Sequence, residues 1–331
     1  MSKRIGQETR TNRWGYFFIA PFVLVFCVFN LYPTLYTFIL SFSDLQGLRS
    51  DFSLVGFKNF IRLVQDQNFW GALKNTFIIW GFNFVPQLGV ALLFAVWLSD
   101  TRLNLTGGGL FRAIVYMPNL LTAVSVAMLY KSLFGFGGHA IAPVNQILYP
   151  LGINVPVFID GVQQFDANGQ PLREAINFFR IVPFTRGLVA FIQWWMWYGN
   201  TLIILMAGIT AIPVSLYEAA VVDGANGRQT TWFITLPLLR PIMLFVLVTS
   251  AIGGMQMFDI PFLLTDGWGS PNRSILTTTM YQYNMAFGRG SNNYSYGAAI
   301  SIGIFVVTMV LSLLFFFFLQ DRSDFKKGGK A

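Results

Sequence analysis

The chain has 331 residues, of which 54% are apolar, 17% are aromatic and only 11% are charged. A soluble domain carries roughly 25% charged residues, so this composition excludes an ordinary soluble globule and a disordered chain and indicates a membrane protein. The net charge of +8 is modest and lies mostly in loops and tails, so we expect no nucleic-acid partner.

Long stretches free of Asp, Glu, Lys and Arg mark the candidate membrane spans. A spanning helix needs roughly 20 mostly apolar residues, because the hydrocarbon core of a bilayer is about 30 Å thick. The charge-free stretch 132–159 is rejected as a span, since four glycines and three prolines interrupt it. The predicted fold is therefore all-α, an integral membrane domain over 14–320. Its six spans are predicted at about 16–39, 76–98, 111–133, 187–209, 241–264 and 297–319.

The tails set the predicted orientation. An even number of spans places both tails on one side, and the short tails 1–13 and 321–331 are rich in Lys and Arg. The positive-inside rule assigns such segments to the cytoplasm. The long loop 134–186 is then external, with a short helix expected near 145–151, and the loop 210–240 is cytoplasmic.

The cytoplasmic loop 210–240 is predicted to fold into two short helices. Ser215 and Glu218 have the spacing of a capping box, which would open the first helix, and Gly224 is placed to end it. A second helical piece is expected from about 228 to 234, with Pro237 as its end. Small residues at the crown of this loop leave room for the close approach of a partner surface.

The same loop resembles a known signature. It reads Glu218-Ala219-Ala220, then Gly224, then Ile234-Thr235-Leu236-Pro237. These positions match in identity and spacing the EAA loop of permease subunits in binding-protein-dependent ABC importers, carbohydrate branch (maltose, oligosaccharide and glycerol-3-phosphate type). Segments elsewhere in the chain are also similar to those subunits: Ala20-Pro21, Leu31-Tyr32-Pro33, Gly56-Phe57-Lys58-Asn59-Phe60, and Phe258-Asp259 followed by Leu263-Leu264-Thr265.

The resemblance implies a function and a set of partners. The fold would be the six-helix core of a type I importer, embedded in the lipid of a cell (inner) membrane and importing a sugar or related solute by alternating access. The partners would be a second permease, two copies of a cytoplasmic ATPase that binds ATP and Mg, and an extracytoplasmic solute-binding protein. The loop would couple this chain to the ATPase; a purely local capping role for Glu218 is the alternative. The coupling residues would be Glu218, Ala219, Ala220, Asp223 and Gly224.

Polar and aromatic residues inside spans are candidates for a solute path. Gln193, Trp197 and Asn200 follow one another at i, i+4 and i+7, on one face of the fourth span. The alternative for these residues is an aromatic belt at the lipid interface. Ser250, Gly254 and Met257 share a face of the fifth span, where close helix packing is the alternative role for glycine.

Other classes of protein find little support. The single cysteine, Cys27, and the single histidine, His139, predict no disulfide and no metal site, and the sequence has no GxxxxGK[ST] phosphate loop. We therefore expect no catalytic residue and no bound cofactor in this chain. An ion-coupled secondary transporter is the alternative function, but the spans hold few titratable groups. Asp259 is one of them, and we expect it to pair with Arg273 or Arg289.

Overall fold

The computed structural model describes residues 2–47, 51–99, 108–135, 143–156, 158–159, 162–165, 170, 173–174, 176–288 and 292–319. The described residues are mainly helical, and each of the strands has two residues, which confirms the all-α prediction. The chain divides into two compact units: unit 1 holds 1–66 and 282–303, and unit 2 holds 67–281 and 304–331. The two units are described separately below.

Unit 1 begins with a long helix that is apolar from Trp14 onward. α1 (Ser2–Phe26) continues through a π-helical turn, Cys27–Leu31, into α2 (Tyr32–Ser41). In this turn the amide of Tyr32 donates to the carbonyl of Cys27, five residues back. The wider turn accommodates Pro33 near the start of α2 without a break in the helix. The most apolar 18-residue window within residues 14–41 has a mean hydropathy of 2.0, and the segment is long enough to cross a membrane.

The remainder of unit 1 is tied together by polar contacts. α3 (Lys58–Gln65) lies beside the start of α15 (Tyr294–Leu319). The hydroxyl of Tyr296 donates to the carboxylate of Asp66, and the guanidinium of Arg62 lies 3.9 Å from the centroid of the Tyr296 ring. The hydroxyls of Ser43 and Ser295 are 2.7 Å apart. These contacts join segments that are more than 200 residues apart in the sequence.

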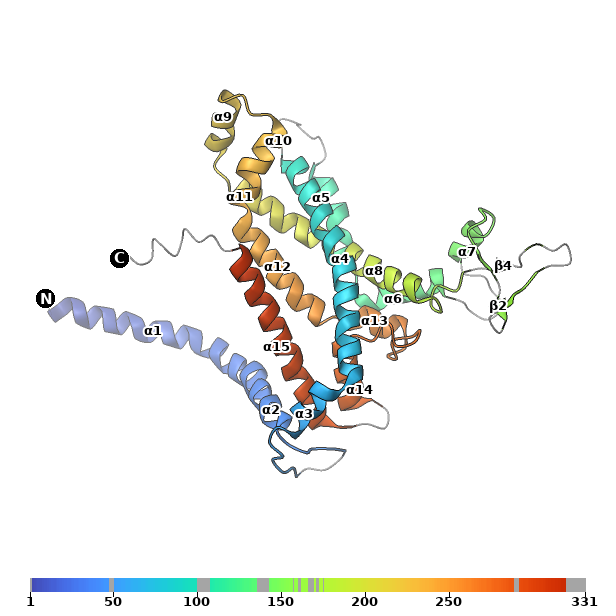
Figure 1. The fold of residues 1–331 in the computed structure, drawn as a ribbon. Helices are drawn as coiled ribbons and strands as arrows, with labels where there is room; N and C mark the ends of the chain where they lie inside the picture. The colour runs from blue at the N-terminus through green and yellow to red at the C-terminus, as the bar shows by residue number, and fades with distance from the viewer. Residues whose placement is uncertain are drawn as a thin grey trace. The chain divides into compact units, whose positions relative to one another are not determined.

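The core of unit 2 is a pair of long helices, α4 (Gln67–Ser99) and α8 (Val182–Thr210). They lie side by side, and the Nε2 of Gln87 donates to the Oγ1 of Thr201 across the pair at 2.7 Å. α8 is the more buried of the two: 56% of its most apolar window is buried, against 33% for α4. Other helices of the unit pack around this pair (Figure 1).

The third predicted span, 111–133, differs from an unbroken helix. It forms α5 (Gly108–Tyr116) with a 3-10 turn, Met117–Leu120, followed by α6 (Ala123–Phe134), and the two parts meet at 88°. Pro118 lies in the 3-10 turn, and Leu121 and Thr122 are extended. The side chain of Thr122 then caps α6 by accepting from the amide of Ser125. A side-chain cap of this kind stabilises the first turn of a helix. A separate helix, α6, therefore begins here in a new direction.

The fifth predicted span, 241–264, is also interrupted. α12 (Arg240–Met255) and α13 (Asp259–Leu264) are separated by three non-helical residues. In all, five described helical segments are long and apolar enough to cross a membrane, or six if α5 and α6 count as one span. Segments 14–41, 67–99, 182–210, 240–264 and 294–318 are the five.

The segment between α6 and α8 carries short elements. α7 (Pro143–Leu148) lies where a short helix is predicted, and the Nδ2 of its Asn145 donates to the carbonyl of Ile176 at 2.7 Å. β1 (Val155–Pro156) pairs with β4 (Arg173–Glu174), and β2 (Phe158–Ile159) pairs with β3 (Val162–Gln163), both antiparallel. His139 lies outside the described residues.

Short helices connect α8 to α12 in the loop 210–240. They are α9 (Val214–Val222), α10 (Gly227–Thr230), a π-helical turn (Thr231–Thr235) and α11 (Leu236–Leu238). α9 and α10 lie at the end of unit 2 where α4 ends, and α13 lies away from that end (Figure 1). α14 (Thr278–Phe287) completes the order of helices before α15.

Candidate functional site

Unit 2 contains a cavity of about 290 Å³ between α4, α8 and α12, which we call the central cavity. All six residues predicted for a solute path line it, namely Gln193, Trp197, Asn200, Ser250, Gly254 and Met257. Gln193, Trp197 and Asn200 lie on one face of α8. Ser250 and Gly254 lie on α12, and Met257 lies in the break that follows it. Two neighbouring tryptophans on α8, Trp194 and Trp195, do not line the cavity.

The lining combines flat aromatic rings with amides and hydroxyls. Aromatic groups come from Trp80, Trp197 and Phe258. Polar groups come from side chains on α4, α8 and α12 and from the break after α12. They are Asn83, Gln87, Gln193, Asn200, Thr201, Thr249, Ser250 and Gln256, with Asp259 as the one ionisable group. Small-molecule sites combine apolar and aromatic side chains with polar groups that fix the orientation of the ligand.

The contribution of α4 to the lining of the cavity is not predicted from the sequence. Trp80, Asn83 and Gln87 follow at i, i+3 and i+7 and share the face of α4 that lines the cavity. The signal is present, because two amides inside an apolar span are unusual. The Oδ1 of Asn83 is buried and has no hydrogen-bond partner among the described residues. A buried acceptor without a donor is costly, so the amide of Asn83 lowers the stability of this wall of the cavity.

Gly254 is needed for close packing at the wall of the cavity. A Cβ at this position would lie 2.6 Å from the Cγ of Trp80, whereas a Cβ at Gly253 would meet nothing within 4 Å. The Trp80 ring cannot easily move, because it stacks on Phe84 at 5.4 Å and its Nε1 donates to the hydroxyl of Ser250 at 3.1 Å. Packing is thus one role of Gly254, alongside its place in the lining.

We expect Gly254→Ala to destabilise unit 2 by about 1–3 kcal/mol, the usual cost of overpacking a tight contact. Gly253→Ala is the matched control and should be close to neutral, since its added methyl group meets open space. Thermal unfolding of the two purified variants in the same mild detergent measures the difference. Equal unfolding temperatures for both variants would contradict the packing described for Trp80.

The loop 210–240 forms a compact projection at the end of unit 2, as α9 followed by α10. Gly224 has φ of +76°, and its amide and that of Ala225 donate back to Val221 and Ala220 at 3.0 and 2.9 Å. Glycine adopts this left-handed backbone without steric cost, which ends the helix cleanly. The predicted end of the first helix at Gly224 therefore agrees with the structure.

The predicted capping box at Ser215 and Glu218 is wrong. Helix α9 begins at Val214 after Pro213, so Ser215 lies within the first turn and makes no cap. A capping box instead opens α10: the Asn226 side chain accepts from the amide of Gln229 at 2.9 Å, and the Gln229 side chain accepts from the amide of Asn226 at 2.8 Å. Glu218 is thereby free of the local capping role that was its alternative.

Pro237 does not end the second helical piece, contrary to the prediction. The amide of Leu236 donates to the carbonyl of Thr231, five residues back, in a π-helical turn, and the helix continues through Pro237 to Leu238. The same arrangement precedes Pro33 in unit 1. In both places the wider turn lets proline occupy an early position of the next helix, where its missing N–H is not needed.

The five predicted coupling residues differ in exposure. Glu218, Ala219, Asp223 and Gly224 are exposed, whereas Ala220 is only 6% exposed. The side chain of Ala220 therefore faces inward, on the side of α9 opposite to the exposed residues. Two valines beside these residues, Val221 and Val222, are 52% and 87% exposed. Exposed apolar side chains of this kind, next to small residues, are typical of a surface that a partner covers.

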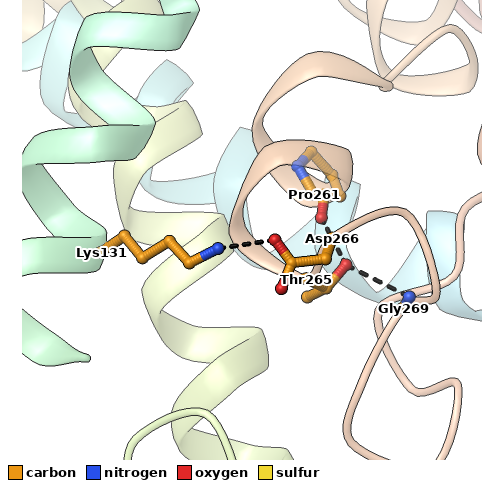
Figure 2. Close-up of polar contacts among 5 residues, drawn as sticks. All are labelled: Lys131, Pro261, Thr265, Asp266 and Gly269. Atoms are coloured by element: carbon orange, nitrogen blue, oxygen red, sulfur yellow. Dashed lines mark hydrogen bonds and ion pairs between the residues drawn. The ribbon is translucent and has the colours of Figure 1, made fainter. Parts of the chain in front are cut away.

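An ion pair joins α6 to the turn after α13. The Nζ of Lys131 lies 2.6 Å from the Oδ1 of Asp266 (Figure 2). The turn is held by Thr265, whose hydroxyl donates to the carbonyl of Pro261 at 2.6 Å and accepts from the amide of Gly269 at 3.2 Å. The predicted pairing of Asp259 with Arg273 is wrong: Arg273 donates to the Oδ1 of Asn68 at 2.9 Å. Arg289, the other predicted partner, lies outside the described residues.

We expect Asp266→Asn to cost less than about 1 kcal/mol of unfolding free energy. Both ends of the ion pair are exposed, at 45% for Lys131 and 77% for Asp266, and such pairs contribute little. Asp266 has φ of +52°, a conformation that asparagine tolerates, so the substitution isolates the charge. Thermal unfolding at low and high salt checks this, and a loss of several kcal/mol would contradict it.

Known proteins resemble this chain over most of its length. Residues 8–325 match the family described as binding-protein-dependent transport system inner membrane component. The lactose transport system permease protein LacF of Rhizobium radiobacter is 33% identical over 93% of this chain and 94% of that protein. The arabinooligosaccharides transport system permease protein AraP of Bacillus subtilis is 32% identical over 90% of this chain and 86% of that protein.

A solved structure shares the fold. A chain from a crystal structure of a bacterial ABC transporter involved in the import of the acidic polysaccharide alginate aligns with a TM-score of 0.72 at 22% identity. The alignment covers 94% of this chain and 96% of that chain. The likeness extends over nearly the whole chain and agrees with the predicted importer permease fold.

Proposed function

Because the chain belongs to the family of inner membrane components of binding-protein-dependent transport systems, we propose that it is the permease subunit of an ATP-driven importer of a sugar or related solute. The proposal rests above all on the central cavity, which combines aromatic rings with amide and hydroxyl groups. Aromatic faces pack on the apolar faces of sugar rings, and the amides and hydroxyls can bond to ring hydroxyls. The relatives named for lactose and arabinooligosaccharides support the same class of solute.

The projection formed by α9 and α10 supports a coupling role. Glu218, Ala219, Asp223 and Gly224 are exposed on it, and Ala220 supports them from beneath. We propose that this surface seats in a cytoplasmic ATPase, which binds ATP and Mg in its own chain and is present in two copies. A second permease subunit and an extracytoplasmic solute-binding protein would complete the assembly, with both termini of this chain in the cytoplasm.

In the proposed cycle, the external binding protein delivers the solute, and ATP-driven closure of the ATPase dimer opens the central cavity outward. Closure of the ATPase dimer moves the α9–α10 projection, and the helices attached to it, α8 and α12, carry the two main walls of the cavity. Because the projection is connected directly to α8 and α12, its movement at the ATPase changes the positions of the cavity walls. ATP hydrolysis then returns the assembly to its resting state.

The source of energy tests the function. The purified assembly, reconstituted into liposomes with its binding protein, should take up the solute only when ATP is present on the ATPase side. Ionophores that dissipate proton and sodium gradients should leave uptake unchanged. Uptake that follows an imposed ion gradient without ATP would favour the alternative, an ion-coupled secondary transporter.

A further inference from the structure

The break between α12 and α13 leaves backbone carbonyls that need donors from outside the two helices. α12 ends at Met255 and α13 begins at Asp259. In an unbroken helix the carbonyl of Met257 would accept from the amide four residues later. That residue is Pro261, which has no N–H and whose ring would clash with the carbonyl. Met255 is fully buried and Met257 is 4% exposed, so water has little access to these two carbonyls.

Three consecutive threonines, which we call the threonine cluster, supply the donors. The hydroxyl of Thr277 donates to the carbonyl of Met257 at 2.8 Å. The hydroxyl of Thr279 donates to the carbonyl of Met255 at 3.0 Å, and that of Thr278 donates to the same oxygen at 3.4 Å. These donors lie 20–24 residues further along the chain. The break is thus held by tertiary hydrogen bonds from the start of α14.

The threonine cluster is itself fixed to α4. The amide of Thr278 donates to the hydroxyl of Thr76 at 3.0 Å. The side-chain amide of Asn75 donates to the carbonyl of Leu276, directly before the cluster, at 3.3 Å. Thr76 and Asn75 belong to α4, which also supplies Trp80 to the lining of the central cavity. The cluster therefore connects the break after α12 to a helix that forms another wall of the same cavity.

The segment that the cluster holds lies in the lining of the central cavity. Gln256, Met257 and Phe258 all line it, and neither helix includes them. We propose that Thr277 and Thr279 are positioning residues for the solute path: their hydroxyls hold this segment so that it forms one wall of the central cavity. The inference rests on the proposed function, because it concerns the same cavity.

A buried thiol reports how the break is held without knowledge of the solute. Cys27, the only cysteine of the chain, is replaced by alanine, and Met257→Cys places a reporter where the native side chain is 4% exposed. The assembled complex in liposomes is treated with a small neutral methanethiosulfonate, and the rate of modification is followed by mass spectrometry. Thr279→Val removes one donor and keeps the shape of the side chain, whereas Thr279→Ser keeps the donor.

We expect Thr279→Val to raise the modification rate about tenfold, because a buried carbonyl that loses its donor favours conformations in which water reaches it. Thr279→Ser should keep the original rate. Thr277→Val, which removes the donor to the second carbonyl, should also raise the rate, and Thr277→Ser should not. Unchanged rates in both valine variants would overturn the inference.

Thr308→Val is the matched control for the loss of a hydroxyl. The hydroxyl of Thr308 donates to the carbonyl of Ile304, within α15, at 2.7 Å, and Thr308 does not line the central cavity. This variant should leave the modification rate unchanged. A rise equal to that of Thr279→Val would show that any lost hydroxyl loosens the complex, and it would overturn the specific role of the threonine cluster.

Uptake by the variants without the reporter separates this inference from the proposed function. Thr279→Val should raise the concentration of liganded binding protein that gives half-maximal uptake about fivefold, while the amount of assembled complex and the maximal rate of uptake stay the same. An unchanged half-maximal concentration would overturn the positioning role. If the unsubstituted complex accumulates no solute with ATP, the proposed function fails, and the modification rates still decide whether the threonine cluster holds the break.

Discussion

Glu218→Lys is expected to reduce ATP-driven uptake on the order of 100-fold, near the upper end of typical coupling free energies between two sites. Glu218 is exposed on α9 and takes no part in the capping box, which belongs to α10. The substitution therefore leaves the local fold intact and reverses a charge on the proposed ATPase contact. Uptake into liposomes and the basal ATPase rate, measured together, check this: uptake should fall while ATP hydrolysis no longer responds to solute.

Two variants control for this result. Ser215→Lys adds the same ammonium group to an exposed position on the same helix, outside the five predicted coupling residues, and should leave most of the uptake. Glu218→Gln keeps the size of the side chain and should show an intermediate loss. Normal uptake by Glu218→Lys, at equal amounts of protein in the membrane, would count strongly against the coupling role of α9.

Trp197→Ala is expected to weaken transport through the loss of an aromatic surface in the central cavity. Trp197 lines the cavity and is 48% exposed, so its ring face is available to a solute. Loss of about 1–2 kcal/mol of solute binding corresponds to a factor of about 5–30 in apparent affinity. The concentration of liganded binding protein that gives half-maximal uptake measures the change, while the amount of assembled complex should stay the same.

Trp97→Ala is the matched control for Trp197→Ala. Trp97 is on α4, is 47% exposed and does not line the central cavity, so the same truncation at this site should leave uptake kinetics nearly unchanged. An equal loss in both variants would show that general destabilisation, rather than contact with the solute, explains the effect of Trp197→Ala.

Features that depend on short-range spacing could be predicted from the sequence. Gln193, Trp197 and Asn200 share a face because the α-helix has 3.6 residues per turn, and the structure places that face on the central cavity. Gly224 ends α9 because the left-handed backbone at this position suits glycine. Neither feature requires knowledge of which helices are neighbours.

Features that depend on tertiary packing could not be predicted in this way. Asn83 and Gln87 line the cavity only because α4 packs against α8, a pairing that α4's own sequence does not specify. Asp259 faces the cavity because α12 ends before it and a new helix begins. The missed bend after Leu120 has a local signal in Pro118, but proline is tolerated inside α4 at Pro86. Residue type alone therefore does not locate a break.

The central claim is that this chain works as one subunit of an importer whose energy comes from a separate ATPase. The most direct test is to purify the tagged chain from its native membrane in mild detergent and to identify the proteins that accompany it by mass spectrometry. We expect an ATPase with a phosphate-binding Walker A loop and a second membrane protein that carries the EAA pattern. A chain that is purified alone, and stays alone after cross-linking in intact membranes, would contradict the claim and favour a self-sufficient transporter.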